Sequence, residues 1–266
     1  MAEPQHKRQK TDKKYELLYH PRIPGRGEYV RLALEATGTQ FVDVANQEEG
    51  GYAKVQAVFD PKSVGDEHGN PPAFAPPILK VHGEGKEGKD LVISQTSNIL
   101  LYLGSKLGLI GSQEHELYIV NEIALTALDL SDGAHDTHHP LASVKFYEDQ
   151  KEAALENSKN FREVRIPKFF SYFERVLKSN EAEGKGRHLV GSKLTYADTT
   201  LWQVLDGVKF AFPKEVDARQ DDYPLLLGTF YGGLKQEKWL AEYLESDRRL
   251  KYSMGVFRHY PELDRQ

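Results

Sequence analysis

The sequence predicts a protein of two parts, an α/β domain over residues 15–108 and an all-helical domain over residues 113–266. The first support is the order of patterns, since short apolar strand patterns alternate with helical patterns as far as Gly108. The second is that strand patterns stop near Gln113, after which long helical patterns follow. Such a change of element type marks a domain boundary, and a length of 266 residues suits two domains.

Residues 1–14, which precede these domains, are polar and charged without apolar periodicity. Because the segment cannot bury enough apolar surface to order itself, a disordered tail is predicted. The basic run from Lys7 to Lys10 resembles a nuclear import signal, although such runs are common on disordered tails. A cytoplasmic protein is therefore expected, with nuclear import as the alternative.

Four strands and two helices are predicted in the N-terminal domain. The strands are expected at Tyr15–Tyr19, Gln40–Val44, Ile78–His82 and Leu91–Ile93. Apolar residues at helical spacing predict the helices Glu28–Thr37 and Thr96–Leu107, with Gly38 and Gly108 at their C-terminal ends. The turn 83–88 predicts a hairpin, and residues 46–74 are rich in Gly, Pro, Asp and Glu, which indicates a long irregular connection.

The second domain is predicted to be helical over about 113–132, 145–180, 196–210 and 234–245. Pro167 lies inside the second of these patterns and should kink that helix, because proline lacks a backbone N–H. Thr195 followed by Asp198 predicts an acidic variant of the capping box at the start of the third. This pair is expected to serve folding.

Composition limits the possible partners. The formal charge of -5 argues against a nucleic acid or a membrane surface, which attract positive faces, and no stretch is apolar for the length of a membrane span. Cysteine is absent, which excludes disulfides, thiolate zinc sites and a cysteine nucleophile. Any thiol chemistry must therefore use a thiol that the ligand carries.

The most specific motif is Ala75-Pro76-Pro77-Ile78-Leu79 before one strand, followed by Gln95-Thr96 at the start of the next helix. The N-terminus of a helix offers unpaired N–H groups and the positive end of a dipole, so it suits a carboxylate. The chain segment before Pro77 can pair with an extended peptide as a strand edge does. These residues together predict a site for a small peptide with a free carboxylate.

A second motif places Tyr19 at the end of the first strand, before Gly25-Arg26-Gly27-Glu28. Together with the order of elements, the two motifs resemble the cytosolic glutathione transferases of the tyrosine type, nearest to the sigma and alpha classes. The resemblance implies a thioredoxin-like N-terminal domain, an all-helical C-terminal domain and glutathione as co-substrate. It also implies that the Tyr19 hydroxyl donates a hydrogen bond to the glutathione sulfur, which favours the nucleophilic thiolate.

The same resemblance assigns the glutathione contacts. Gln95 and Thr96 are expected to hold the γ-glutamyl end, and Pro77 is expected to follow a cis peptide bond. Pro76 has no N–H, so it can only accept a backbone bond from the cysteinyl amide, and weaker affinity is expected. Lys54 is a further expected contact.

A homodimer is also implied, with Asp129 reaching across the interface to the γ-glutamyl ammonium of the partner's glutathione. The alternative for Asp129 is an ordinary exposed charge on its helix. The second substrate is expected to be a hydrophobic electrophile held between the loop from His20 to Pro24 and the helices of the second domain.

Some features leave alternatives open. The loop between Tyr19 and Gly25 is one residue longer than in the resembling classes, so Arg22 is a substitute for Tyr19 if the tyrosine points elsewhere. Tyr19 could instead be a structural tyrosine, and the whole chain a non-catalytic binding or assembly module on this fold. The thiolate could also serve isomerisation or peroxide reduction. His135, Asp136, His138 and His139 invite a metal interpretation, but their spacing matches no known zinc site, so no metal is expected.

Overall fold

A computed structural model describes residues 14–266 of the protein. The predicted tail and its basic run at Lys7 lie outside the described residues, apart from Lys14. Four strands form one sheet in the order β2-β1-β3-β4, namely β1 (Tyr15–Leu18), β2 (Phe41–Asp43), β3 (Ile78–Val81) and β4 (Leu91–Ser94). β1 pairs in parallel with β2 and antiparallel with β3, and β3 and β4 form the predicted antiparallel hairpin.

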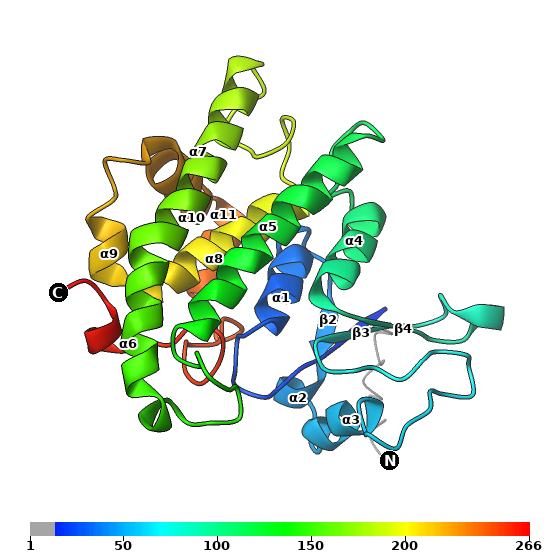
Figure 1. Cartoon of the computed structure of the whole chain (residues 1–266). Coiled ribbons are helices and arrows are strands. Elements are labelled where there is room, and N and C mark those ends of the chain that lie inside the picture. Colours follow the sequence, from blue (N-terminus) through cyan, green and yellow to red (C-terminus); the bar gives the residue numbers. More distant parts are fainter. Residues whose placement is uncertain (1–13) are drawn as a thin grey trace, which may run out of the picture.

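Both faces of the sheet are covered by helices, as Figure 1 shows. Successive strand residues point to opposite faces, so Leu17 and Leu79 pack in the main core with α1 (Gly27–Ala36) and α4 (Thr96–Leu107). Leu18 and Ile78 pack on the other face, in a smaller core with Val44 and Val55. The alternation of apolar residues in the strands therefore decides which helices cover which face.

The connection expected to be irregular over residues 46–74 is partly helical, which corrects that prediction. Helix α2 (Val44–Gln47) begins at the last residue of the predicted second strand and runs into this connection, and α3 (Gly51–Val58) lies within it. A short 3-10 turn, η1 (Lys86–Gly88), follows later, in the hairpin. The helices form because Val44 and Val55 bury their side chains completely in the smaller core. The sequence around Val44 and Val55 is polar and rich in glycine, so it did not predict that these two valines would be buried.

The second part of the chain is helical, as predicted. Its elements are α5 (Glu116–Asp136), η2 (Tyr147–Asp149), α6 (Lys151–Asn160), η3 (Phe161–Arg165), α7 (Ile166–Ala182), α8 (Tyr196–Ala211), α9 (Pro213–Asp217), η4 (Pro224–Gly232), α10 (Gly233–Lys235), α11 (Lys238–Leu244) and η5 (Pro261–Leu263). None of the helices in residues 14–266 combines the length and apolar content needed to cross a membrane.

The expected interruption at Pro167 is present. The segment just before it, η3, has π-helical hydrogen bonding between the α-helices α6 and α7. Pro167 has no N–H to donate to a carbonyl one turn earlier, which explains why the regular ladder changes here. The capping box at α8 is also confirmed, because the Thr195 N–H donates to the Asp198 carboxylate over 2.7 Å and both residues are fully buried.

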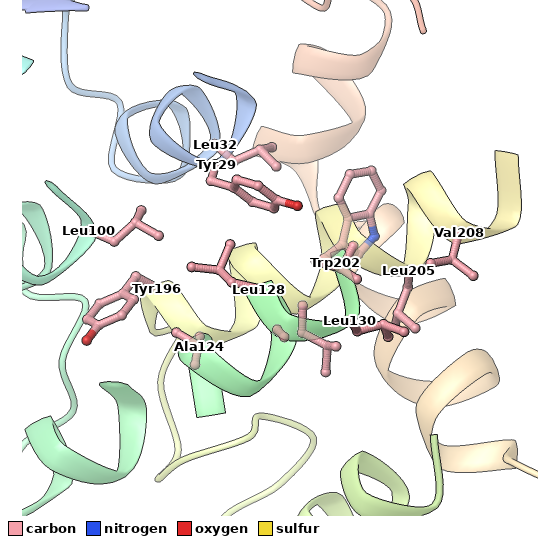
Figure 2. Close-up of a cluster of buried hydrophobic side chains, with 14 of the residues drawn as sticks. Tyr29, Leu32, Leu100, Ala124, Leu128, Leu130, Tyr196, Trp202, Leu205 and Val208 are labelled. Carbon is pink, nitrogen blue, oxygen red and sulfur yellow. The ribbon is translucent and has the colours of Figure 1, made fainter. Parts of the chain in front are cut away.

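An apolar cluster joins the two parts of the molecule (Figure 2). Tyr29 and Leu32 of α1 lie against Leu128 of α5 and Trp202 of α8, with Leu100 of α4 beside them. The Tyr29 hydroxyl donates to the Ser131 Oγ over 2.7 Å. Helix α1 therefore packs within the main core against both the sheet and the helical part of the chain, and this fixes the sheet relative to α5.

A buried charged cluster lies near this core and consists of Glu28, Arg31, Asp43, Asp206 and Arg249. The Glu28 carboxylate accepts hydrogen bonds from Arg249 Nη1 at 2.6 Å and from Arg31 Nη1 at 3.1 Å. Arg31 Nε also donates to Asp43 over 2.7 Å, and Arg249 Nη2 donates to Asp206 over 2.9 Å. Charges this deeply buried persist only when paired, so the cluster links α1 to the C-terminal segment.

Candidate functional site

A cleft of about 430 Å³ opens where the loop before β3, the start of α4 and the middle of α5 meet. It is lined by Arg26, Phe74, Ala75, Pro76, Pro77, Gln95, Thr96, Ser97, Leu125, Leu128, Asp129 and Asp132. Both sequence motifs around Pro76 and Gln95 therefore meet in one place. The peptide bond between Pro76 and Pro77 is cis, as expected.

Helix α4 presents its N-terminus to this cleft. Gln95 precedes the helix with φ of 71°, a left-handed conformation that few residues other than glycine adopt. Its side chain does not cap the helix, and it is exposed, whereas Thr96 is buried. The N–H groups of the first turn lack partners within the helix, and a strained residue at a ligand site is a common functional signature. The local structure is suited to holding a carboxylate.

Charges of both signs line the opposite wall. Arg26 Nη2 and Asp132 Oδ1 form an ion pair of 2.8 Å that is partly exposed on both sides. Asp129 is exposed on the same helix as Asp132, three residues earlier, and both line the cleft. Residues three apart lie on the same side of a helix, so this spacing was the signal that could have found Asp132, which sequence reasoning missed.

Tyr19 lies deeper than the cleft, and the residues that line the cleft do not include it. Its ring is buried and its hydroxyl oxygen accepts a hydrogen bond from the backbone N–H of Arg26 at 2.9 Å. The hydroxyl hydrogen has no acceptor among residues 14–266. Burial raises the pKa of the Tyr19 hydroxyl above 10.0, against a smaller lowering by the Arg26 N–H. The group is therefore protonated at neutral pH and able to donate.

Glycine makes room for this tyrosine. A Cβ on Gly25 would lie 2.3 Å from the Tyr19 Oη, and a Cβ on Gly27 would lie 2.7 Å from the ring. Gly25 also has φ of 43°, which favours glycine. The Gly-Arg-Gly sequence thus lets the backbone before α1 pass directly over Tyr19, with the Arg26 N–H facing its oxygen.

Arg22 lies in the loop between Tyr19 and Gly25. It has φ of 59°, its N–H donates to Asn46 Oδ1 over 2.8 Å, and its side chain is exposed. It lines a separate cavity with Phe210 and Tyr252, near the C-terminal segment. Arg22 is thus placed away from the cleft that holds Gln95.

Lys54 also lies outside this cleft. It is on α3, is exposed, and pairs with Glu48 over 2.6 Å. Phe74 is a lining residue that sequence reasoning missed. Its side chain is 89% exposed at the rim of the cleft, although it is large and apolar.

The C-terminal segment lies beside the loop expected to face a second substrate. A Cβ on Gly255 would lie 3.1 Å from Ile23 Cγ2 and 3.9 Å from Gly25 Cα. The next residue, Val256, is buried, and its carbonyl accepts a hydrogen bond from His138 Nε2 at 3.1 Å. The C-terminal segment therefore borders the region next to Tyr19.

The three histidines at the end of α5 form a compact group. The ring centroids of His135, His138 and His139 lie 4.7–5.1 Å apart. His138 is buried, and burial lowers its pKa to about 3. Within the described part of the chain, no cluster of His, Cys, Asp and Glu has the arrangement to hold a metal ion.

Residues 135–247 match the family model described as "Glutathione S-transferase, C-terminal domain". "Glutathione S-transferase P 1" of Xenopus laevis is 29% identical over 89% of this chain and 94% of that protein. "Glutathione S-transferase" of Plasmodium falciparum is 24% identical over 79% of this chain and 86% of its own length.

Solved structures show the same fold. The chain is similar to the sigma class GST of Fasciola hepatica, with a TM-score of 0.64, 22% identity, and coverage of 89% of this chain and 97% of that chain. The Pi-class glutathione S-transferase of Onchocerca volvulus gives a TM-score of 0.63, with 24% identity and coverage of 87% and 92%. The resemblance thus extends across several classes and does not single out the sigma or alpha pattern.

Proposed function

We propose, from the premise that this chain belongs to the glutathione S-transferase family, that its cleft binds glutathione and that Tyr19 activates the thiol for transfer to a hydrophobic electrophile. The observation that carries the proposal is the meeting, in one cleft, of the strained Gln95 at the start of α4, the backbone at Pro76 and two carboxylates of α5. A transferase is favoured over a non-catalytic module because the curated relatives named above are called transferases.

The cleft matches glutathione group by group. We assign the γ-glutamyl carboxylate to the N–H groups at the start of α4 and to the side chains of Gln95 and Thr96. The γ-glutamyl ammonium is assigned to Asp129, with Asp132 beside it. The carbonyl of Pro76 would accept the cysteinyl N–H, and without an N–H of its own this residue makes a single backbone bond.

Tyr19 is proposed as the catalytic residue. Its protonated hydroxyl has a hydrogen without an acceptor among the described residues, and the Arg26 N–H holds the oxygen in place at 2.9 Å. Donation of this hydrogen to the sulfur stabilises the thiolate relative to the thiol, so it lowers the thiol pKa from its ordinary value near 8.5. The thiol proton passes to solvent and the thiolate attacks the electrophilic carbon. With a chloro-dinitrobenzene type electrophile, the carbon–chlorine bond then breaks and chloride leaves with the bonding electron pair.

A homodimer is proposed from the exposed side of α5. Tyr118 and Leu125, which are 70% and 42% exposed, lie seven residues apart and so on one side of the helix, and Asp129 follows one turn later. Phe74, 89% exposed, stands at the rim of the same cleft. Large exposed apolar side chains near one another mark a contact surface. We propose that a second copy of the chain covers these side chains.

We also propose a cytoplasmic location for the protein.

The test is the variant Tyr19→Phe, which keeps the ring and removes the hydroxyl. A charge-assisted hydrogen bond contributes about 1.5–3 kcal/mol, so the thiol pKa should rise by about one to two units. The rate of conjugation to a chloro-dinitrobenzene type electrophile at neutral pH should fall about ten- to a hundredfold and recover toward pH of about 9. Glutathione affinity should stay nearly unchanged.

The matched control is Tyr15→Phe, at the start of β1, the strand that Tyr19 directly follows, and it should leave the pH profile unchanged. A Tyr19→Phe protein with the wild-type profile would overturn the catalytic assignment. Retention on immobilised glutathione, released by free glutathione, separately tests the cleft. Failure of retention by the wild-type protein would argue against glutathione as the ligand whatever the role of Tyr19.

A further inference from the structure

The three histidines at the end of α5 have no part in the glutathione contacts assigned above, and two of them have structural partners. His138 is buried and its Nε2 binds the Val256 carbonyl. His139 Nδ1 lies 3.3 Å from the side-chain amide of Gln150, which also binds the backbone of the loop that follows. His135 makes neither kind of contact. Among residues 14–266 its only hydrogen-bond partner is the neighbouring carboxylate of α5.

His135 continues the side of α5 that borders the cleft at the start of α4. Leu128 and Asp132 line that cleft, and His135 follows Asp132 by three residues on the same helix. Residues at positions i, i+4 and i+7 lie along one side of a helix, with the Cβ atoms of neighbours about 5–6 Å apart. His135 is therefore about one turn beyond the Arg26–Asp132 ion pair, toward the C-terminal end of α5.

The C-terminal segment connects this end of α5 with the region next to Tyr19, and Figure 1 shows the two close together. The ring centroids of His135 and His138 lie 5.1 Å apart, and His138 binds the C-terminal segment at Val256. The residue before Val256 packs against the loop that follows Tyr19. His135 therefore borders the region between that loop and the helical domain, where the second substrate is expected.

The ring of His135 is oriented by Asp136. Its Nδ1 lies 3.2 Å from Asp136 Oδ1, and because a carboxylate only accepts, Nδ1 carries a hydrogen and Nε2 is left for another partner. The side chain is 27% exposed, and Nε2 is not one of the buried unpaired atoms of the described chain, so it is open to solvent. A histidine with one nitrogen held by a carboxylate and the other free can transfer a proton.

Charges of both signs surround this histidine. Asp132 and Asp136 lie on its own helix and compensate a positive charge on the ring when Nε2 also carries a proton. Arg258 of the C-terminal segment opposes such a charge from the side of His138 and His139. The ring therefore has carboxylates along α5 and a cation on the other side.

A proton donor beside the thiolate matters for one class of electrophile. When chloride is displaced, the product needs no proton. When the thiolate adds to an α,β-unsaturated carbonyl compound, sulfur bonds to the far carbon of the C=C bond, and the π electron pair moves onto the carbon next to the carbonyl and onto the oxygen. This enolate becomes the product only when the carbon next to the carbonyl takes a proton.

We propose that His135 is a catalytic residue that gives this proton, and that the second substrates are α,β-unsaturated carbonyl compounds. The proposal rests on the proposed function, since it needs the thiolate at Tyr19. The Nε2–H bond of His135 breaks and the proton bonds to the carbon next to the carbonyl through the electron pair of the enolate. His135 then takes a proton from water, to which the thiol has released one, so no further reactant is needed.

The variant His135→Gln tests the proposal, because glutamine keeps a side-chain N–H for Asp136 but does not carry a proton. The full-length protein at saturating glutathione is assayed with benzylideneacetone for addition and with a chloro-dinitrobenzene type electrophile for substitution. The kcat for addition should fall about a hundredfold or more, and the kcat for substitution should change by less than about threefold. The control His115→Gln, at an exposed position before the other end of α5, should change neither.

Reaction in deuterium oxide gives a second measurement, which a change in folding alone would not move. The wild-type protein should place deuterium on one face of the carbon next to the carbonyl, because a single acid in a fixed position supplies it, whereas His135→Gln should give both faces by NMR. Unchanged addition and stereochemistry in His135→Gln, or equal losses of addition and substitution, would overturn the role of His135 and leave the proposed function standing. Absence of both reactions in the wild-type protein would overturn the proposed function itself.

Discussion

The cleft at the start of α4 and the buried charged cluster both contain an arginine from the same short stretch of chain, but one arginine is partly exposed and the other is buried. Arg26 lies at the rim of the cleft, where its ion pair with Asp132 is partly exposed. Arg31, five residues later, is almost fully buried and contacts Glu28 and Asp43. The two arginines differ because Arg31 faces the junction of α1 with the C-terminal segment, whereas Arg26 precedes the helix and faces open space.

The difference in burial between the two arginines predicts that one acts mainly in ligand binding and the other mainly in stability. An exposed ion pair contributes little, because water and salt screen it. The side chains of such a pair can therefore exchange this contact for one with a charged group of a ligand. A buried pair lowers stability severely when one partner is lost, since the other charge remains buried without compensation. Substitutions in the cleft should therefore change affinity, and substitutions in the buried cluster should change the free energy of unfolding.

The largest effect is expected for Glu28→Gln. Glu28 is fully buried and accepts hydrogen bonds from Arg31, Arg249 and Tyr243. Removing its charge leaves two buried arginines undercompensated, and the free energy of unfolding should fall by about 3–5 kcal/mol. Urea denaturation measures this. The control Glu35→Gln breaks the Arg248 pair at the surface and should change it by less than about 1 kcal/mol. If both variants lost the same free energy of unfolding, burial would not explain how much an ion pair contributes to stability in this protein.

The variant Gly25→Ala tests the loop that joins the cleft to the buried cluster. The new Cβ would lie 2.3 Å from the Tyr19 Oη at a φ of 43°, so it combines backbone strain with displacement of the hydroxyl. Strain alone should lower stability by about 1–3 kcal/mol, and the conjugation rate should fall as well. Gly38→Ala is the control, because Gly38 has φ of 63° and nothing within 4 Å of its Cβ. A Gly25→Ala enzyme as active as Gly38→Ala would mean that Tyr19 does not act through its present position.

The pH dependence of stability should reveal His138, a buried group outside both regions. Burial lowers the pKa of the folded His138 to about 3 from its ordinary value of 6.5, and His135, His139 and Arg258 face it with charges that oppose protonation. The unfolded chain therefore binds the proton more tightly, so this stability is complete above pH 6.5 and is lost as pH falls toward 3.

Between pH of about 8 and about 5, the loss from His138 should be about 2 kcal/mol. The variant His138→Gln keeps an N–H for the Val256 carbonyl but does not titrate, so the pH dependence of its urea midpoint should be flatter by that amount. An unchanged slope would show that His138 does not carry this acid sensitivity.

The smallest effect on stability is expected in the cleft. Asp132→Asn removes the charge that pairs with Arg26, and because the pair is partly exposed the free energy of unfolding should change by about 0.2–1 kcal/mol. The glutathione dissociation constant, measured by calorimetry, should nonetheless change, since both residues line the cleft. Lys209→Ala, which breaks an exposed pair with Asp217, controls for the loss of a surface ion pair. If Asp132→Asn lowered the free energy of unfolding by more than the free energy of glutathione binding, Asp132 would act mainly in stability, as the residues of the buried charged cluster do.

The sequence by itself determined the features that depend on neighbouring residues. The strands β1, β3 and β4 and the helices α1, α4 and α8 lie close to their predicted bounds, because apolar periodicity and capping residues act over a few positions. The capping box of Thr195 and Asp198 is such a local signal, whereas the cis bond before Pro77 was expected from the family resemblance. The order of strands and helices resembles that of the glutathione transferases, and this resemblance led us to expect Pro76 and Gln95 in one cleft. The ligand contacts of these two residues and of Tyr19 stay predictions.

Only the tertiary structure decided the features that depend on residues distant in sequence. The helices α2 and α3 form where Val44 and Val55 meet the far face of the sheet, which no local pattern indicated. The pairing of Arg26 with Asp132 joins residues 106 positions apart, and that of Glu28 with Arg249 joins residues 221 apart. The packing of α1 between the sheet and the helical domain decides whether an arginine faces a cleft or a buried carboxylate. The residues that neighbour each arginine in the sequence do not determine this packing.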